Sequence, residues 1–351
     1  MISLLIAAGV GLLVSIFGTP YAIRYFRRRE IGQFIQEEIA GMHGHKQGTP
    51  TMGGVVFVTA AIIGYFVSHI RVVQSSGGLA FEFQPLSEGG LLAVFALSGM
   101  AVVGLLDDWT KYSNKRSLGL SKSAKFGGQL AIAALFAWGA SMAGVVTEIS
   151  FVRPLGIDLG PFFVIWVLIM LTGAANGVNL ADGMDGLAGG SSALVVASYT
   201  VIAFWQFRNQ PPFRVPGVYE AVDPLELAII SAAMFGAILG FLWWNAPPAK
   251  IIMGDVGSQA IGGLLAALAL LAIITYLYKN RKSVILYVIP MAFMFITTLY
   301  AMIHQLVEFI RNQDTALVIV TVIILGLALW LVFEAALAHF KARVNRNRVS
   351  A

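Results

Sequence analysis

Long apolar segments limit what this chain can fold into. Of its 351 residues, 58% are hydrophobic and only 12% are charged, whereas a soluble domain carries about 25% charged residues. A helix that crosses the hydrocarbon core of a bilayer needs about 20 largely apolar residues. Ten such segments follow one another: 2–20, 53–70, 90–106, 126–145, 161–178, 190–207, 226–244, 259–278, 284–308 and 315–338. We predict an all-α integral membrane protein with ten transmembrane helices, forming a single polytopic domain over residues 1–351.

The composition excludes several classes of function. The chain has no cysteine, so neither a disulfide framework nor thiolate chemistry is available. The formal net charge of +5 is modest, and the basic residues stand mainly in loops. That distribution suits the surface of an anionic lipid leaflet, and we expect no nucleic-acid partner. The first apolar segment has no basic region before it and no obvious cleavage site, so we interpret it as a retained helix.

Loop charge predicts how the helices are oriented. With the N-terminus outside, the loops after the first and third helices face the cytoplasm, and each holds five lysine and arginine residues. The opposite loops in this half hold only Arg71 and Arg153. Because lysine and arginine accumulate on the cytoplasmic side, we expect the N-terminus, and with ten helices also the C-terminus, to lie outside. The basic residues of the last third would then lie outside too. Segment 146–160, on the outer side, alternates in hydrophobicity and is compatible with a small hairpin.

Three short acidic loops stand at the ends of apolar segments, and the predicted orientation puts all three on the cytoplasmic face. Carboxylates at membrane depth are costly and usually functional. In the first loop, Asp107 and Asp108 precede Lys111, which shares their helix face if the helix continues. Adjacent carboxylates repel unless a cation neutralises them, and Mg²⁺ prefers such oxygen ligands. Lys111 would then hold phosphate oxygens. The alternative is a solvated helix end with an ordinary cytoplasmic lysine.

The second loop repeats a polar residue every third position between glycines, at Asn176, Asn179, Asp182 and Asp185. Glycines allow a ligand to approach the backbone closely. The loop lacks the bidentate glutamate of a calcium loop, and the alternative interpretation is a polar, glycine-rich connection.

The third loop, at 245–258, ends one helix and begins the next. Asp255 and Ser258 fit a helix cap, but a helix N-terminus also attracts anions. With Mg²⁺ held by Asp255, this end could bind a pyrophosphate. His43 and Lys46 precede a run of small residues at 48–54 on the same face. That run is compatible with a phosphate or nucleotide contact, and the alternative for His43 is a solvated side chain.

Taken together, these strings resemble the polyprenyl-phosphate N-acetylhexosamine phosphate transferases. Within that superfamily they are most similar to the phospho-N-acetylmuramoyl-pentapeptide transferases of peptidoglycan synthesis. The residues that carry the resemblance are 48–54, 107–111 with 116–120, 176–188 and 243–258, and the resemblance extends from about residue 1 to about residue 270.

The resemblance implies ten transmembrane helices, a cytoplasmic active site in the bacterial cell membrane, dependence on Mg²⁺, and substrates that are UDP-MurNAc-pentapeptide and undecaprenyl phosphate. The products would be lipid I and UMP, and the family also allows a homodimer. On the matching positions the catalytic residues would be Asp107, Asp108, Lys111 and Asp255. Asp255 would be the main Mg²⁺ ligand, joined by Asp107, Asp108 and Asn179, and Asp107 would be the base. Substrate would be bound by His43, Lys46, Thr51, Asn179, Asp182, Asp185 and Asn245, with the last two nearest the uracil.

The sequence departs from the family at three places. An Asp-Gly-Pro string is replaced at residues 38–40, and Ile252 stands where an aromatic residue is usual. The family's loop with three consecutive histidines is not found; His304 and Glu308 keep the spacing of its first histidine and glutamate, but the other two histidines are missing. Two alternatives therefore remain. One is a sister transferase that uses another UDP-N-acetylhexosamine, and the other is a catalytically impaired or engineered homologue that keeps the scaffold. A transporter fits less well, because the charges cluster at one membrane face.

Overall fold

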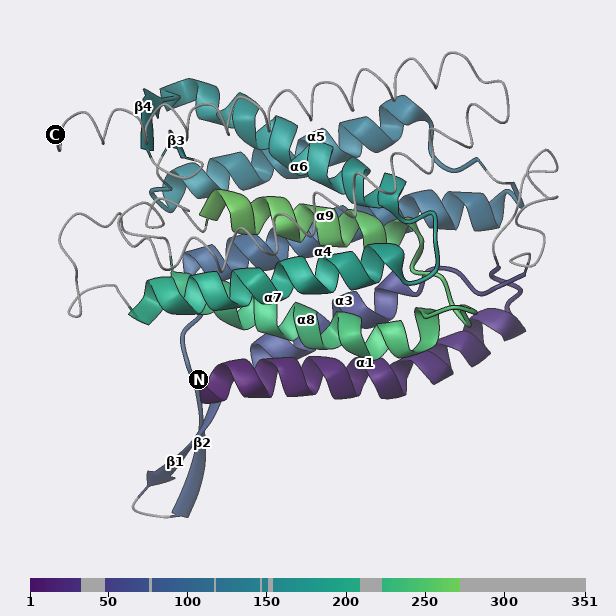
Figure 1. The fold of residues 1–351 in the computed structure, drawn as a ribbon, viewed down its shortest axis with the longest axis horizontal. Helices are drawn as coiled ribbons and strands as arrows, with labels where there is room; N and C mark the ends of the chain where they lie inside the picture. The colour runs from purple at the N-terminus through teal and green to yellow at the C-terminus, as the bar shows by residue number, and fades with distance from the viewer. Residues whose placement is uncertain are drawn as a thin grey trace, which may run out of the picture. The chain divides into compact units, whose positions relative to one another are not determined.

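The computed structural model describes residues 1–32, 48–75, 78–116, 118–145, 147–150, 154–208 and 223–271. Helices dominate this part of the chain (Figure 1). Six of them are long and apolar enough to cross a membrane, so the protein is a multi-pass membrane protein. The α-helices in these ranges are α1 (Ile2–Arg28), α3 (Gly54–Val67), α4 (Glu88–Ser113), α5 (Lys122–Met142), α6 (Phe163–Ala181), α7 (Leu187–Arg208), α8 (Pro224–Asn245) and α9 (Gly254–Leu271).

Each of the first eight predicted apolar segments overlaps one of these helices, with different ends. The last two segments, 284–308 and 315–338, lie outside the described residues, so the count of ten helices, the position of the C-terminus and the single domain stay predictions. One of these differences in bounds matters for function. Helix α4 continues to Ser113, seven residues past its predicted end at 106.

Two antiparallel hairpins make the all-α prediction incomplete. Strands β1 (Ile70–Ser75) and β2 (Gly78–Phe83) pair from Ile70 opposite Phe83 to Ser75 opposite Gly78. β1 is rich in β-branched residues, which favour a strand, and for this reason α3 ends at Val67 and not at residue 70. Strands β3 (Glu148–Ser150) and β4 (Pro154–Asp158) form the hairpin that the alternating segment allowed, and a short 3₁₀ turn, η3 (Gly160–Phe162), leads into α6.

Small residues let the helices pack closely. An added Cβ at Gly236 of α8 would lie 2.0 Å from the Ala8 carbonyl oxygen of α1, and one at Gly104 of α4 would lie 2.2 Å from the Asp255 carbonyl oxygen of α9. Close backbone contact through glycine is typical of helix packing in membranes, where lipid offers no hydrophobic gain for association. The contact at Gly104 has a direct consequence, because it brings the C-terminal part of α4 against the first turn of α9.

The two ends of the bundle differ in character. The hairpins and the N-terminus lie at one end, and the connections α4–α5, α6–α7 and α8–α9 lie at the other (Figure 1). At the hairpin end, the Tyr65 hydroxyl donates to Glu226 Oε2 (2.6 Å), and His69 Nε2 lies 2.9 Å from the same oxygen. This cluster ties α3 to the first turn of α8. The connections at the opposite end are the three acidic loops of the sequence.

Candidate active site

Three aspartates from two helices meet at the loop end of the bundle. Asp107 and Asp108 come from α4, and Asp255 comes from the first turn of α9. Each offers a carboxylate oxygen, and these oxygens all lie within 4.8 Å of one another. Asp107 and Asp108 are only 3% and 4% exposed. The structure therefore brings together the first and third acidic loops, which are separated by about 150 positions in the sequence.

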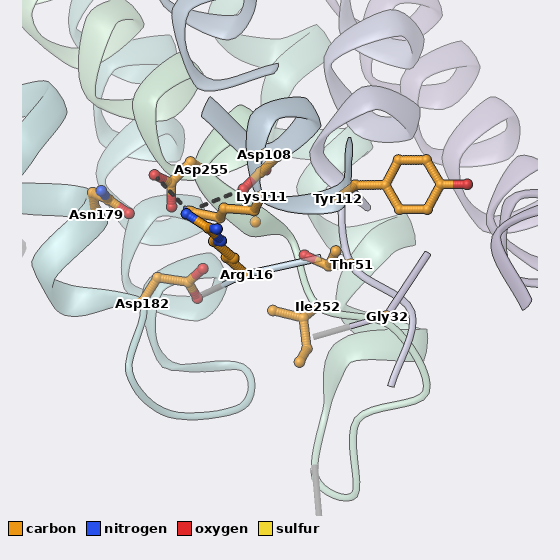
Figure 2. Close-up of a pocket in the computed structure, with 11 residues that line it drawn as sticks. Gly32, Thr51, Asp108, Lys111, Tyr112, Arg116, Asn179, Asp182, Ile252 and Asp255 are labelled. Atoms are coloured by element: carbon orange, nitrogen blue, oxygen red, sulfur yellow. Dashed lines mark hydrogen bonds and ion pairs between the residues drawn. The ribbon is translucent and has the colours of Figure 1, made fainter. Parts of the chain in front are cut away.

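Two lysines partly neutralise this cluster. Lys111 Nζ lies 2.7 Å from Asp107 Oδ2. It also lies 3.3 Å from Asp108 Oδ1 and 3.2 Å from Asp255 Oδ2 (Figure 2). Because α4 continues, Lys111 does lie on the face of both aspartates, as the sequence predicted. Lys125, in the first turn of α5, pairs with Asp255 Oδ2 and lies 3.7 Å from Asp107 Oδ2. The two ammonium groups balance two of the three carboxylates in formal charge.

Lys125 was missed by the sequence reasoning, which counted it only as a marker of the cytoplasmic side. A signal for it did exist. Lys125 directly precedes the predicted apolar segment 126–145, and an ionisable side chain so close to membrane depth usually has a partner or a function.

The Asp107 carboxylate is held by the connection between α4 and α5. The Leu120 N–H donates to Asp107 Oδ1 at 3.0 Å. The preceding residue, Gly119, lies against the same carboxylate: an added Cβ would be 2.6 Å from Oδ1 and 2.7 Å from both Cγ and Oδ2. Any side chain at this position would displace the aspartate. Gly119 and Leu120, which carry part of the family resemblance, therefore hold the Asp107 carboxylate in its position.

The Asp108 carboxylate is held by the beginning of α9. The Val256 N–H donates to Asp108 Oδ2 at 3.1 Å, a use of the exposed donors of a helix N-terminus. Gly254 has a φ of +71°, and its Cβ would lie 2.5 Å from Asp108 Oδ2. Ser258 does not serve as a cap here, since its hydroxyl donates to the carbonyl oxygen of Gly254 within its own helix (3.2 Å). Glycine is therefore required at 254 for its conformation and for the space it leaves.

Residues 50–54 are hydrogen-bonded to the third acidic loop. Gly53 N–H donates to the Ile252 carbonyl (2.9 Å), Gly54 N–H donates to the Met253 carbonyl (2.8 Å), and Ile252 N–H donates to the Pro50 carbonyl (2.8 Å). These bonds bring Thr51 to the wall of the site. The two candidates that precede this segment, His43 and Lys46, lie outside the described residues.

The second acidic loop supplies Asn179 and Asp182. Only one orientation of the Asn179 amide matches its neighbours: its nitrogen faces Asp255 Oδ1 (3.1 Å) and Ser258 Oγ (3.0 Å), and its oxygen faces Lys125 Nζ (3.2 Å). In this arrangement Asn179 orients Asp255 and does not direct its oxygen to the carboxylates. Its part as a metal ligand stays a prediction. Asp182, at the end of α6, lines the site.

Asp185 and Asn245 join the second loop to the third. Asp185 Oδ2 accepts from the Ala249 N–H (3.2 Å). Asn245 is 2% exposed; its Oδ1 accepts from the Gly186 N–H (3.1 Å) and its Nδ2 donates to the Ile251 carbonyl (2.9 Å). In the described structure both side chains hold the loops together, and their predicted contact with uracil is not tested by this arrangement.

A cavity of about 190 Å³ opens beside the aspartates. Pockets for drug-sized ligands usually measure about 300–1,000 Å³, so this one suits a small charged group such as a phosphate, with the rest of a nucleotide extending from it. Among its lining residues Arg116 and Tyr112 were not predicted site residues. In Figure 2 the Arg116 side chain points toward Lys111 and the acidic cluster. The cavity is lined by Gly32, Thr51, Asp108, Lys111, Tyr112, Arg116, Asn179, Asp182, Ile252, Gly254 and Asp255.

The donor set fits a hard divalent cation. Carboxylate oxygens are the ligands that Mg²⁺ takes from proteins, commonly one or two at a time alongside substrate phosphates. The three aspartates converge within reach of one ion. The Lys111 ammonium contacts all three of them, so the centre of the cluster is a place where positive charge is stabilised.

Comparison with known proteins gives the class first. Residues 91–273 match the model described as glycosyl transferase family 4, so the protein is a membrane-embedded phosphosugar transferase. Residues 46–58 match signature 1 of phospho-N-acetylmuramoyl-pentapeptide-transferase. Proteins of that name are similar over most of the chain. The one from Frankia alni is 44% identical over 284 residues, which cover 78% of this chain and 77% of the relative. The one from Saccharopolyspora erythraea is 45% identical over 282 residues, covering 77% and 76%. The chain belongs to the phospho-N-acetylmuramoyl-pentapeptide-transferase family.

Proposed function

We propose that this protein transfers phospho-MurNAc-pentapeptide from UDP-MurNAc-pentapeptide to undecaprenyl phosphate, giving lipid I and UMP for peptidoglycan synthesis. Family membership supports the reaction, and the observation that carries it to particular residues is the meeting of Asp107, Asp108 and Asp255 with two lysines. We further propose that the site faces the cytoplasm of a bacterial cell and that the helices span its cytoplasmic membrane.

Phosphoryl transfer needs positioning and charge neutralisation more than covalent help from the protein. Lys111 is 29% exposed, so its ammonium can reach substrate while it contacts the aspartates. In our proposal it neutralises phosphate oxygens. Asp107 accepts the proton of the lipid phosphate, which leaves that phosphate ionised for attack on the sugar-bearing phosphorus. The Leu120 N–H and Gly119 fix the position of the Asp107 carboxylate as base.

We assign the metal to the same aspartates. Asp255 is the proposed main ligand of Mg²⁺, with Asp107 and Asp108 beside it. When bound, such an ion neutralises the diphosphate and stabilises the departing UMP. Lys125 and Asn179 hold Asp255 in place for this purpose, through contacts with both of its carboxylate oxygens.

The remaining predicted residues belong to the nucleotide side in this proposal. Thr51 and Asp182 stand on the cavity wall beside the aspartates, where a sugar nucleotide has to pass to reach them. Asp185 and Asn245 support the loops behind that wall. The full set of proposed substrate-binding residues is His43, Lys46, Thr51, Asn179, Asp182, Asp185 and Asn245.

A direct assay tests the proposal. Purified protein in lipid nanodiscs is given UDP-MurNAc-pentapeptide, undecaprenyl phosphate and Mg²⁺, and UMP release is measured. We expect release that requires both substrates and the metal and that is abolished in Asp255→Asn. A second UDP-N-acetylhexosamine, without the peptide, is assayed in parallel. Faster turnover of that donor favours the sister transferase, and binding of UDP-MurNAc-pentapeptide without turnover, beside an active relative, favours an impaired homologue.

A further inference from the structure

A second polar layer lies directly beneath the charged one. Helices α5, α6 and α9 each contribute one residue to the charged layer, namely Lys125, Asn179 and Asp255. Each helix also carries an amide side chain one turn further from the loop end of the bundle. We call Gln129, Asn176 and Gln259 the amide layer.

The spacing of the two layers follows from helix geometry. Residues three or four positions apart lie on one face of a helix. The separations are four in α5, three in α6 and four in α9. α6 ends at the site and α5 and α9 begin there. All three steps therefore lead away from the loops, and the two layers lie one above the other.

The amide layer is closed by hydrogen bonds between helices. Gln129 Nε2 donates to Gln259 Oε1 (2.8 Å) and to Asn176 Oδ1 (3.1 Å), while Asn176 Nδ2 donates back to Gln129 Oε1 (2.9 Å) and also to the Thr172 carbonyl (2.9 Å). Gln129 is the central member, since both of its amide atoms are used and it contacts both other helices.

The glutamines of the amide layer are buried, so their polar atoms depend on hydrogen bonds within the protein. Gln129 is 1% exposed and Gln259 is 0% exposed. Polar side chains within the membrane are retained where they join helices or serve function. Hydrogen bonds have strict angles, whereas apolar packing tolerates rotation. The bonds from Gln129 to Asn176 and Gln259 thus fix the rotation of α5, α6 and α9 about their axes, although the buried Gln259 Nε2 has no hydrogen-bond partner. The rotation of each helix in turn decides where Lys125, Asn179 and Asp255 point.

We propose that Gln129 and Gln259 are positioning residues for the Lys125–Asn179–Asp255 group. They touch no substrate and act through the orientation of three helices. This inference rests on the proposed function for its kinetic readout, and it has a second readout that does not depend on transfer. The alternative is that the amide layer contributes only to the stability of the fold.

Methionine replaces glutamine at similar length and volume without its hydrogen bonds, so Gln259→Met and Gln129→Met are the test variants. Gln206→Met is the matched control, because Gln206 is a buried glutamine in α7 at the opposite end of the bundle. The unaltered protein, these three variants and the double variant Gln129→Met/Gln259→Met are compared in nanodiscs at a temperature well below the lowest melting temperature of the set.

Two quantities are measured. Binding of Mn²⁺, a spectroscopic substitute for Mg²⁺, is titrated by electron paramagnetic resonance without substrates. Turnover is followed by UMP release. Loss of partners that orient metal ligands usually costs about 10–100-fold in metal affinity or activity. We expect losses in this range in Mn²⁺ affinity and kcat for both test variants, KM for each substrate within about twofold, and an unchanged control. The double variant should lose little more than the worse single one, because both remove the same bond.

Unchanged Mn²⁺ affinity and kcat in both test variants, with only a lower melting temperature, would overturn the inference. So would equal losses in Gln206→Met. If the unaltered protein binds Mn²⁺ but transfers no phospho-sugar, the proposed function fails on its own, and the Mn²⁺ affinities of the variants still decide the positioning role.

Discussion

Replacing Gly119 by alanine tests whether turnover depends on the exact position of the Asp107 carboxylate. The φ of Gly119 lies outside the left-handed region, so alanine is tolerated by the backbone, and only the added methyl group matters. That methyl would lie 2.6 Å from Asp107 Oδ1, where an ordinary van der Waals contact begins at 3.4 Å. The difference is 0.8 Å. The packed helix α4 cannot shift as a whole, so we expect the Asp107 carboxylate to move by most of this distance. That movement weakens the hydrogen bond that the carboxylate accepts from the Leu120 N–H.

The size of the effect follows from that displacement. A misplacement of about 1 Å in a reacting group can cost about 10²-fold in rate. For a shift of 0.8 Å we expect kcat to fall about 30–100-fold, which is about 2–2.7 kcal/mol at 1.36 kcal/mol for each factor of ten. Affinity for the sugar nucleotide should change little, since Asp107 acts on the lipid phosphate in our proposal.

UMP release at saturating UDP-MurNAc-pentapeptide measures this loss. Gly127→Ala is the control, because a Cβ there meets nothing within 4 Å and Gly127 lies nearby in α5. Thermal unfolding in detergent checks that both variants are folded. A Gly119→Ala protein that is folded and turns over at the rate of the unaltered enzyme would refute the positioning of Asp107 by Gly119.

Three further predictions use the same assays. Lys125→Met should lower kcat about 10²-fold, the typical cost of removing one electrostatic donor from an active site. Lys122→Met, at the exposed first residue of α5, should leave kcat unchanged. Equal effects of the two substitutions would contradict the place of Lys125 in the active site. Gly254→Ala should lower the melting temperature and abolish most turnover, because alanine at a φ of +71° is strained by about 1–2 kcal/mol and its methyl meets a site carboxylate; normal melting would count against this. Tyr65→Phe removes the 2.6 Å bond to Glu226 and should cost about 1.5–3 kcal/mol of stability, as for hydrogen bonds to charged groups, with kcat unchanged; a lower kcat would show coupling between the two ends of the bundle.

Local spacing explains what could be predicted from the sequence. Asp107, Asp108 and Lys111 share one helix, and their contact at 2.7 Å and 3.3 Å follows from the spacing of a helix that continues. The small hairpin at β3–β4 likewise follows from local alternation. The β1–β2 hairpin was not predicted, although Ser68 and His69 interrupt the apolar pattern after α3 and the β-branched residues that follow favour a strand.

Contacts between helices could not be predicted in the same way. Lys125 looked like one more cytoplasmic lysine, and Gln129 and Gln259 looked like isolated polar residues in apolar helices. Which of them meet depends on how α5 and α9 cross and rotate, and the sequence pattern of a membrane helix constrains rotation poorly when residues on all sides are apolar. The role of Gly119 was hidden for the same reason, since its neighbour Asp107 belongs to another element.

The sequence by itself determined that this chain is a membrane helix bundle with its acidic loops at one end, because the bilayer dictates segment length and makes every buried charge conspicuous. The tertiary structure decided how those loops become a site. Close glycine contacts set the distance between α4 and α9, and a hydrogen bond between buried amides joins α5 to α9. Only that packing brings Lys125 to Asp255 and puts the amide layer beneath them, because such neighbours are made by the approach of whole helices.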